Sequence, residues 1–88
     1  MLYSSGMNNS SVKKAVEIVG GQVALAAAVG VKQAHIWQWM NKTRLGAPAE
    51  RVIDISSATN WMVTPHELRP DIYPHPHDGL PNHLRSAS

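Results

Sequence analysis

The sequence predicts a small all-α domain, a bundle of four to five short helices. Apolar residues recur at intervals of three and four along several segments, which places them on one face of a helix. Glycine or proline opens or closes these segments, and no stretch alternates between apolar and polar residues as a strand would. The 88 residues suffice for one domain, and the absence of cysteine excludes disulfides and thiolate metal sites.

The first helix is predicted to begin near Ser10 or Ser11, whose hydroxyl can accept a hydrogen bond from a free N–H group of the first turn. Its apolar stripe has the spacing i, i+3, i+4, i+7 and consists of Val12, Ala15, Val16 and Val19. Gly20 and Gly21 end this helix, because glycine adopts a positive φ without steric cost. Residues 1–10 are small and polar, and they are predicted to be disordered.

Two further short helices are predicted, one over residues 22–29 and one from Lys32 or Gln33 to residue 41. A turn of three residues that contains Gly30 separates them, which is the arrangement of a helix-turn-helix unit. Ala26 is small enough to let the two helices cross closely, and Gly30 supplies the left-handed backbone of the turn. The core of this unit is expected to contain Val23, Val29, Val31, Ile36 and Trp39, with Met40 on the same face as the last two.

The second half of the chain predicts a fourth helix that begins at Pro48 and ends near residues 59–60. Its buried stripe is expected to be Ala49, Val52, Ile53 and Ser56, with Trp61 and Met62 packed beneath it. The segment Thr64-Pro65-His66-Glu67 has the form of a capping box and predicts a single helical turn. Residues 75–88 are rich in proline and histidine and are predicted to be a disordered tail, so that the domain spans residues 11–74.

Charge is divided unevenly along the chain. Residues 1–46 carry a net charge of +4, whereas residues 47–88 carry −2. A positive half favours anionic partners, and nucleic acid is the commonest of these for a small domain, although a solvated basic face gives the same pattern. The chain lacks a membrane-spanning apolar run and a signal peptide, so we expect a cytoplasmic protein with no membrane partner.

The residues between 22 and 39 carry a resemblance to a known pattern. The spacing of Gln22, Val23, Ala26, Gly30, Val31, Ile36 and Trp39 resembles the helix-turn-helix of phage Cro and repressor proteins. The wider segments GGQVALAAAVGVKQAHIWQW, RLGAPAE and ATNWMVTPHELRPDIYP resemble the Cro-like YdaS family of small bacterial prophage regulators and antitoxins. This resemblance implies a lambda-repressor/Cro-like bundle that binds a near-palindromic DNA operator as a homodimer, with the helix at 32–41 in the major groove.

The resemblance also implies which residues face DNA. They are Lys32, Gln33, Ala34, Trp37 and Gln38, with Gln22 at a phosphate-contacting position. At the position of Trp37, Cro-like proteins usually carry a short polar residue, and contact of this tryptophan with DNA, contact with another partner and simple exposed packing all remain open.

The chemistry of these residue types is consistent with DNA binding. The amides of Gln33 and Gln38 can each make two hydrogen bonds to adenine, and Ala34 can contact a thymine methyl group. The cations of Lys32, Lys42 and Arg44 can neutralise phosphates, which gives affinity without sequence information.

The leading hypothesis is therefore a sequence-specific DNA-binding transcriptional regulator, a Cro-like prophage repressor that associates with the nucleoid when bound. The alternative is an antitoxin-type interaction module that binds and masks a toxin-like protein partner. An enzyme is not expected, because the chain contains no nucleophile elbow, phosphate-binding glycine loop or His-Glu-x-x-His motif. No cofactor or metal is expected either, because His75, His77 and Asp78 lie among prolines without a fixed scaffold.

Overall fold

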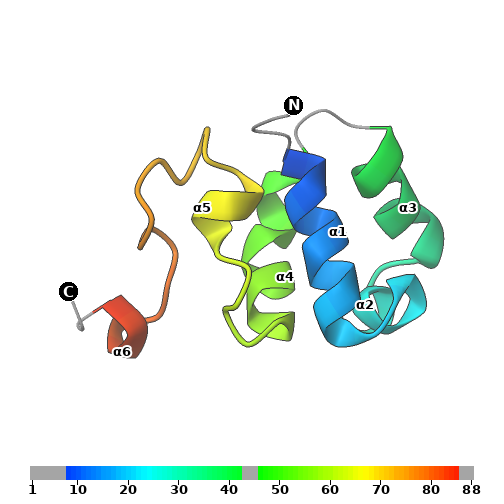
Figure 1. Cartoon of the computed structure of the whole chain (residues 1–88), viewed down its shortest axis with the longest axis horizontal. Coiled ribbons are helices and arrows are strands. Elements are labelled where there is room, and N and C mark those ends of the chain that lie inside the picture. Colours follow the sequence, from blue (N-terminus) through cyan, green and yellow to red (C-terminus); the bar gives the residue numbers. More distant parts are fainter. Residues whose placement is uncertain (1–7, 43–45, 86–88) are drawn as a thin grey trace.

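In the computed structural model, which describes residues 8–42 and 46–85, every regular element of the described chain is helical (Figure 1). The elements are α1 (Asn8–Val19), α2 (Gln22–Val29), α3 (Gln33–Asn41), η1 (Ala49–Arg51), α4 (Val52–Ala58), α5 (Pro65–Leu68) and α6 (Asn82–Arg85). The predicted all-α fold is confirmed. The structure contains two elements beyond the predicted four to five helices, namely α6 and the short 3-10 helix η1, which precedes α4.

Helix α1 is the centre of the bundle. It contacts α2, α3, α4 and α5, and α2 in turn contacts α3 and α4. In Figure 1, α3 lies at one end of the molecule, beyond α1, while α5 and then α6 extend toward the other end. The helix-turn-helix unit is therefore built on one flank of α1, and the C-terminal segments leave from the opposite flank.

The core draws at least one large side chain from nearly every element. Five of the six helices, together with the loop before α5, supply its largest fully buried apolar side chains, which are Val12, Leu25, Ile36, Val52, Ile55, Val63 and Leu68. The predicted stripe of α1 is confirmed, because Val12 and Ala15 are fully buried, Val16 is nearly so, and Val19 packs against the core. Ile36 and Trp39 fix α3 against this core.

Three helices end in the same way. A residue with positive φ follows the last turn, and the next N–H group bonds a carbonyl five residues back, as in the Schellman motif. These bonds run from Gly21 to Val16, from Val31 to Ala26 and from Trp61 to Ser56, at 2.8, 3.0 and 2.8 Å. The residue that follows the last turn is Gly20 (φ 100°), Gly30 (φ 84°) or Asn60 (φ 57°), and at the first and third of these ends the next residue, Gly21 or Trp61, also has positive φ. The predicted helix ends are thus confirmed, with asparagine in place of glycine at the third.

Two predicted core faces are wrong in part. Val23 is 69% exposed, and α2 instead buries Leu25, Ala26 and Val29. This helix is apolar on nearly all sides, so the sequence pattern does not distinguish its buried face.

The buried face of the fourth helix is predicted correctly at Val52 and Ser56, which are both buried. It is wrong at Ala49, which is exposed, and at Ile53, which is 37% exposed, and Ile55 and Thr59 are buried instead. Helix α4 begins only at Val52, after the 3-10 turn η1. A 3-10 helix has three residues per turn, so η1 changes which residues face the core relative to the pattern predicted from Pro48.

Both ends of the described chain also differ from the predicted boundaries. Helix α1 begins at Asn8, before the predicted cap, and the hydroxyl of Ser11 donates to the carbonyl of Glu67 at 2.9 Å. In the segment predicted as a disordered tail, the structure places a turn at residues 75–79 and the helix α6. Gly79 lies so close to α5 that an added Cβ would come within 2.8 Å of Pro65 Cγ, so the turn packs on that helix.

Met62, expected beneath the fourth helix, is 64% exposed.

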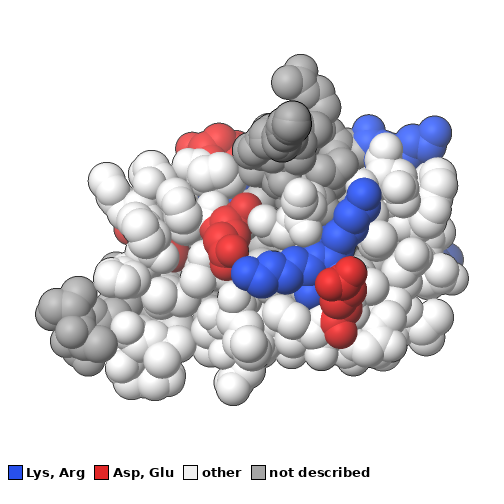
Figure 2. All heavy atoms as spheres, viewed as in Figure 1, with Lys and Arg blue, Asp and Glu red and all other residues white. Residues whose placement is uncertain are grey.

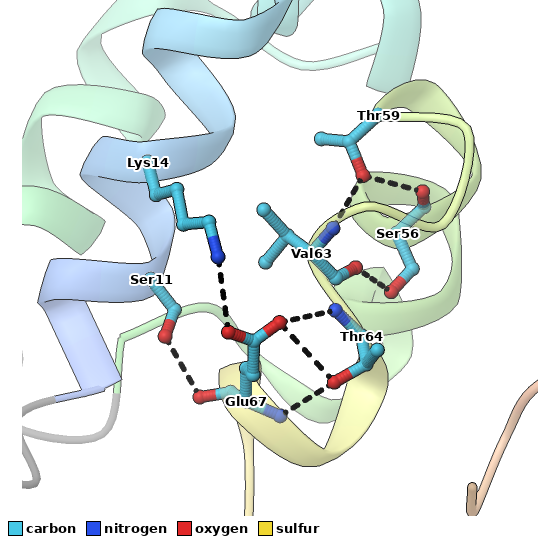
Figure 3. A network of polar contacts seen from close by, with 7 residues as sticks. All are labelled: Ser11, Lys14, Ser56, Thr59, Val63, Thr64 and Glu67. Atoms are coloured by element: carbon cyan, nitrogen blue, oxygen red, sulfur yellow. Dashed lines mark hydrogen bonds and ion pairs between the residues drawn. The ribbon is translucent and has the colours of Figure 1, made fainter. Parts of the chain in front are cut away.

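Buried hydroxyl groups hold the loop between α4 and α5 in place (Figure 3). The hydroxyl of Ser56 donates to the carbonyl of Val63, and the hydroxyl of Thr59 donates to the carbonyl of Ser56 at 2.8 Å. Thr59 also accepts the N–H of Val63 at 3.0 Å. Ser56 and Thr59 are buried, so these bonds satisfy polar groups that water does not reach.

The predicted capping box at α5 is confirmed. The N–H of Glu67 donates to the Thr64 hydroxyl at 3.1 Å, and the N–H of Thr64 donates to Glu67 Oε1 at 3.0 Å. Glu67 also pairs with Lys14 Nζ on α1 at 3.2 Å, as Figure 3 shows. Partial burial by itself raises the pKa of Glu67, but the bonds from Thr64 and Lys14 outweigh it and bring the pKa below its ordinary value of 4.5.

Replacing Ser56 with alanine tests the buried hydroxyl network. We expect Ser56→Ala to lower the free energy of unfolding by about 1–3 kcal/mol, because the carbonyl of Val63 loses its donor in a buried site. The neighbouring Ser57 is exposed in the same helix and provides a matched control. In urea unfolding followed by circular dichroism, Ser57→Ala should change stability by less than about 0.5 kcal/mol. Equal losses in the two variants would contradict the role assigned to the network.

Glu67→Gln tests the link between α1 and α5 through its pH dependence. Because the pKa of Glu67 is lower in the folded chain, the ionised carboxylate stabilises the fold above the unfolded pKa, and this stabilisation is lost as the pH falls through the folded pKa. The difference in Tm between wild type and Glu67→Gln should therefore be largest near neutral pH and shrink below pH 4.5. The exposed Glu17 on α1 supplies the control Glu17→Gln. A Tm difference that is constant with pH would refute the ionic contribution.

Candidate functional site

Helices α2 and α3 form the predicted helix-turn-helix, joined by the three residues Gly30–Lys32. Gly30 has the left-handed conformation and its N–H bonds the carbonyl of Ala26 at 2.8 Å. Helices α2 and α3 are in contact, and Ala26 (4% exposed) and Ile36 (fully buried) both belong to the core on which they pack. This close packing fixes the direction in which α3 leaves the turn.

The two sides of α3 differ sharply in exposure. Ile36 and Trp39 are buried, and Met40 is partly buried against the same core. The predicted site residues of this helix, Gln33, Ala34, Trp37 and Gln38, are all exposed, as is Lys32 immediately before it. The structure therefore brings these five residues together on the outer surface of one helix.

Gln22 and Gln33 are joined by a direct contact. Gln33 Nε2 donates to Gln22 Oε1 at 3.1 Å, which links the first residue of α2 to the first residue of α3. Their positions in the sequence suggest two separate roles and give no sign of this pairing, because the contact depends on how the two helices cross. The bond leaves the carbonyl oxygen of Gln33 and its second N–H proton available to another molecule.

His35 contributes to the order of the turn before α3. The N–H of Lys32 donates to His35 Nδ1 at 3.4 Å, and the N–H of His35 donates to the carbonyl of Lys32 at 3.0 Å. The imidazole also stacks on the buried Trp39, with ring centroids 6.5 Å apart. His35 is itself exposed, and these contacts make it a capping residue at the start of α3, at the edge of the site.

At the other end of α3, Lys42 and Trp37 form a pair. Lys42 Nζ lies 5.6 Å from the centroid of the Trp37 ring, within the range of a cation–π contact. Trp37 is 44% exposed, and its carbonyl accepts a hydrogen bond from Asn41 Nδ2 at 3.0 Å. Arg44, the remaining predicted site residue, lies outside the described residues.

The electrostatic character of this part of the chain is one-sided. From Ile18 to Ala49 the sequence contains no aspartate or glutamate, whereas Lys32, Lys42 and Arg44 fall within that stretch. In Figure 2, which shows one face of the molecule, the region of α3 is white and blue, while red spheres lie together with blue ones over α1 and toward α5. An anionic partner would meet no carboxylate on either helix of the unit.

Other kinds of site find little support in the part of the chain that the structure describes. No group of three His, Asp or Glu side chains there is arranged to hold a metal ion, and this includes the histidines of residues 75–83. Within the same residues, no helix has the length and apolar character to span a bilayer.

Comparisons with known proteins agree with the geometry. A family model described as "Bacterial toxin YdaS" matches residues 12–77. A protein of Escherichia coli (strain K12), named "Putative transcriptional regulator YdaS", is 45% identical over 64 residues, and these cover 73% of this chain and 64% of that protein. The chain thus spans less than two thirds of the length of this relative, and no solved structure matches it. Because the family match extends over well more than half of the residues, from α1 to the turn after α5, the chain belongs to the YdaS family.

Proposed function

We propose that the chain is a sequence-specific DNA-binding transcriptional regulator, a Cro-like prophage repressor that reads the major groove with α3. One observation carries this proposal. Helix α3 exposes Gln33, Ala34 and Gln38 on a surface without acidic residues, with lysines at both of its ends. The name of the Escherichia coli relative supports a regulatory role.

Base contacts are assigned to the two glutamines. A glutamine amide can donate to adenine N7 and accept from adenine N6 at the same time, which distinguishes adenine from the other bases in the major groove. Gln22 accepts a hydrogen bond from one N–H of the Gln33 side-chain amide. The other N–H and the carbonyl oxygen of that amide are the two groups that a bidentate contact with adenine needs. Gln33 is therefore oriented in advance, which reduces the entropy lost on binding.

Phosphate contacts are assigned to the residues around α3 and to the start of α2. Lys32 and Lys42 are exposed at the two ends of α3, and Arg44 follows two residues later. Gly21, which precedes α2, has no side chain to cap that helix, so the N–H groups of its first turn can donate to a phosphate beside Gln22. Two such chains on a near-palindromic operator would place their α3 helices about 34 Å apart.

An antitoxin-type protein-interaction module is the second candidate. The family description names a toxin, and Val23 and Met62 expose apolar surface that the bundle does not use. Such surface suits a protein partner better than a nucleic acid. The two candidates differ in whether the purified chain binds duplex DNA by itself.

Selection of binding sites from random duplexes tests the proposal. We expect a near-palindromic sequence to be enriched, and the binding constant to fall with salt at a log–log slope of about −3 per protomer, because Lys32, Lys42 and Arg44 each displace counterions. Fluorescence anisotropy at several salt concentrations measures this slope. If no sequence is enriched and a stoichiometric protein partner co-purifies from the native host instead, the interaction module is the correct function.

Paired substitutions separate base contacts from phosphate contacts. Gln33→Ala and Gln38→Ala should each cost about 1–3 kcal/mol and relax the preference at one base pair. Lys32→Ala should weaken binding to all sequences alike and reduce the salt slope by about one. Lys13→Ala, on the exposed side of α1, is the matched control and should leave both quantities unchanged. Identical effects of Gln33→Ala and Lys32→Ala on sequence preference would show that this division of roles is incorrect.

A further inference from the structure

The outer surface of α3 carries an apolar strip among its polar residues. Ala34 and Trp37 are three residues apart, hence neighbours on the helix surface, and both are exposed. Trp37 leaves 44% of its surface in contact with solvent, and Ala34 is exposed beside it. The exposed part of this strip is not used by the core and is available to a partner.

The chemistry of the major groove limits what this strip can contact there. Base edges present hydrogen-bond donors and acceptors, and the carbon surface of an indole ring pressed against them would leave those groups without partners, since only the ring N–H can donate. The 5-methyl group of thymine is the exception, because it is the one apolar group among the base edges of this groove. The strip carries no charge and the segment around it carries no carboxylate, so no repulsion keeps it from the DNA.

We propose that Ala34 and Trp37 together recognise the 5-methyl groups of thymine in the operator. This inference rests on the proposed binding of DNA by α3, and it assigns to Trp37 a part in sequence selection. Contact with a methyl group gives a preference for thymine over every base that lacks it, independently of the hydrogen bonds made by Gln33 and Gln38.

The cation–π contact supports this role. Lys42 Nζ sits 5.6 Å from the centroid of the Trp37 ring, which restricts the orientations that the ring can take. The ring also belongs to a residue whose carbonyl is held by Asn41. A methyl group would thus meet an apolar surface that is already in position, and little conformational entropy is lost on contact.

Replacement of thymine by deoxyuridine tests the inference, because it removes only the methyl group. The probe is the duplex recovered by selection, with each thymine of one half-site replaced in turn. We expect wild-type affinity to fall about fourfold at one or two positions, the value for one buried methyl group. Trp37→Ala should lose most of the difference between the thymine and uracil duplexes and keep only the part that Ala34 supplies, whereas Trp37→Phe, which keeps an apolar ring, should retain more of it.

The outcomes separate this inference from the proposed function. If the wild-type chain binds its selected duplex with a steep salt dependence but does not distinguish thymine from uracil at any position, the inference is overturned and DNA binding stands. Selected half-sites that contain no thymine would overturn it in the same way. A Trp37→Ala variant that keeps the full wild-type discrimination would assign the methyl contact to other residues. A chain that binds no duplex at all would overturn both.

Discussion

The close crossing of α2 and α3 is the constraint on which the rest of the structure depends. It requires a small side chain at Ala26 and a left-handed residue at Gly30, and the structure has both. A bulky residue at the first position would separate the helices, and a residue with a Cβ at the second would strain the turn. The direction of α3, the exposure of its outer residues and the bond between Gln22 and Gln33 all follow from this crossing.

The ion pairs and the buried hydroxyl groups of the described residues lie away from α3. Lys14 and Ser11 of α1 bind Glu67 on α5, and the buried hydroxyl groups lie between α4 and α5 (Figure 3). Arg69 adds a two-point contact to Asp71, at 2.9 and 2.7 Å, and donates to the carbonyl of Ala47. The bond from Arg69 lowers the pKa of Asp71. Three carboxylates that take part in ion pairs, Asp54, Glu67 and Asp71, all lie after residue 50, whereas α2 and α3 contain no aspartate or glutamate.

Local signals in the sequence predicted much of this architecture, and contacts between distant residues account for what they missed. The helix ends at Gly20 and Gly30 and the capping box at Thr64 were predictable because each is decided within a few residues. The buried face of α2 was not predictable, because this helix has apolar residues on nearly all sides and the sequence does not show which of them face the core. The pairing of Gln22 with Gln33 joins side chains eleven residues apart, and it can be recognised only when the crossing of their helices is known.

The division of labour within α3 explains how such a site can exist in so small a protein. Ile36 and Trp39 anchor the helix, and their burial contributes to the stability of the whole bundle. The outer residues contribute little of that stability, because surface substitutions away from caps and buried groups usually change it by only about half a kcal/mol. The identities of Gln33, Ala34 and Gln38 are therefore free to be set by what the helix binds. Trp37 is the largest of these outer side chains, and the 44% of its surface that the fold leaves exposed is available to a partner.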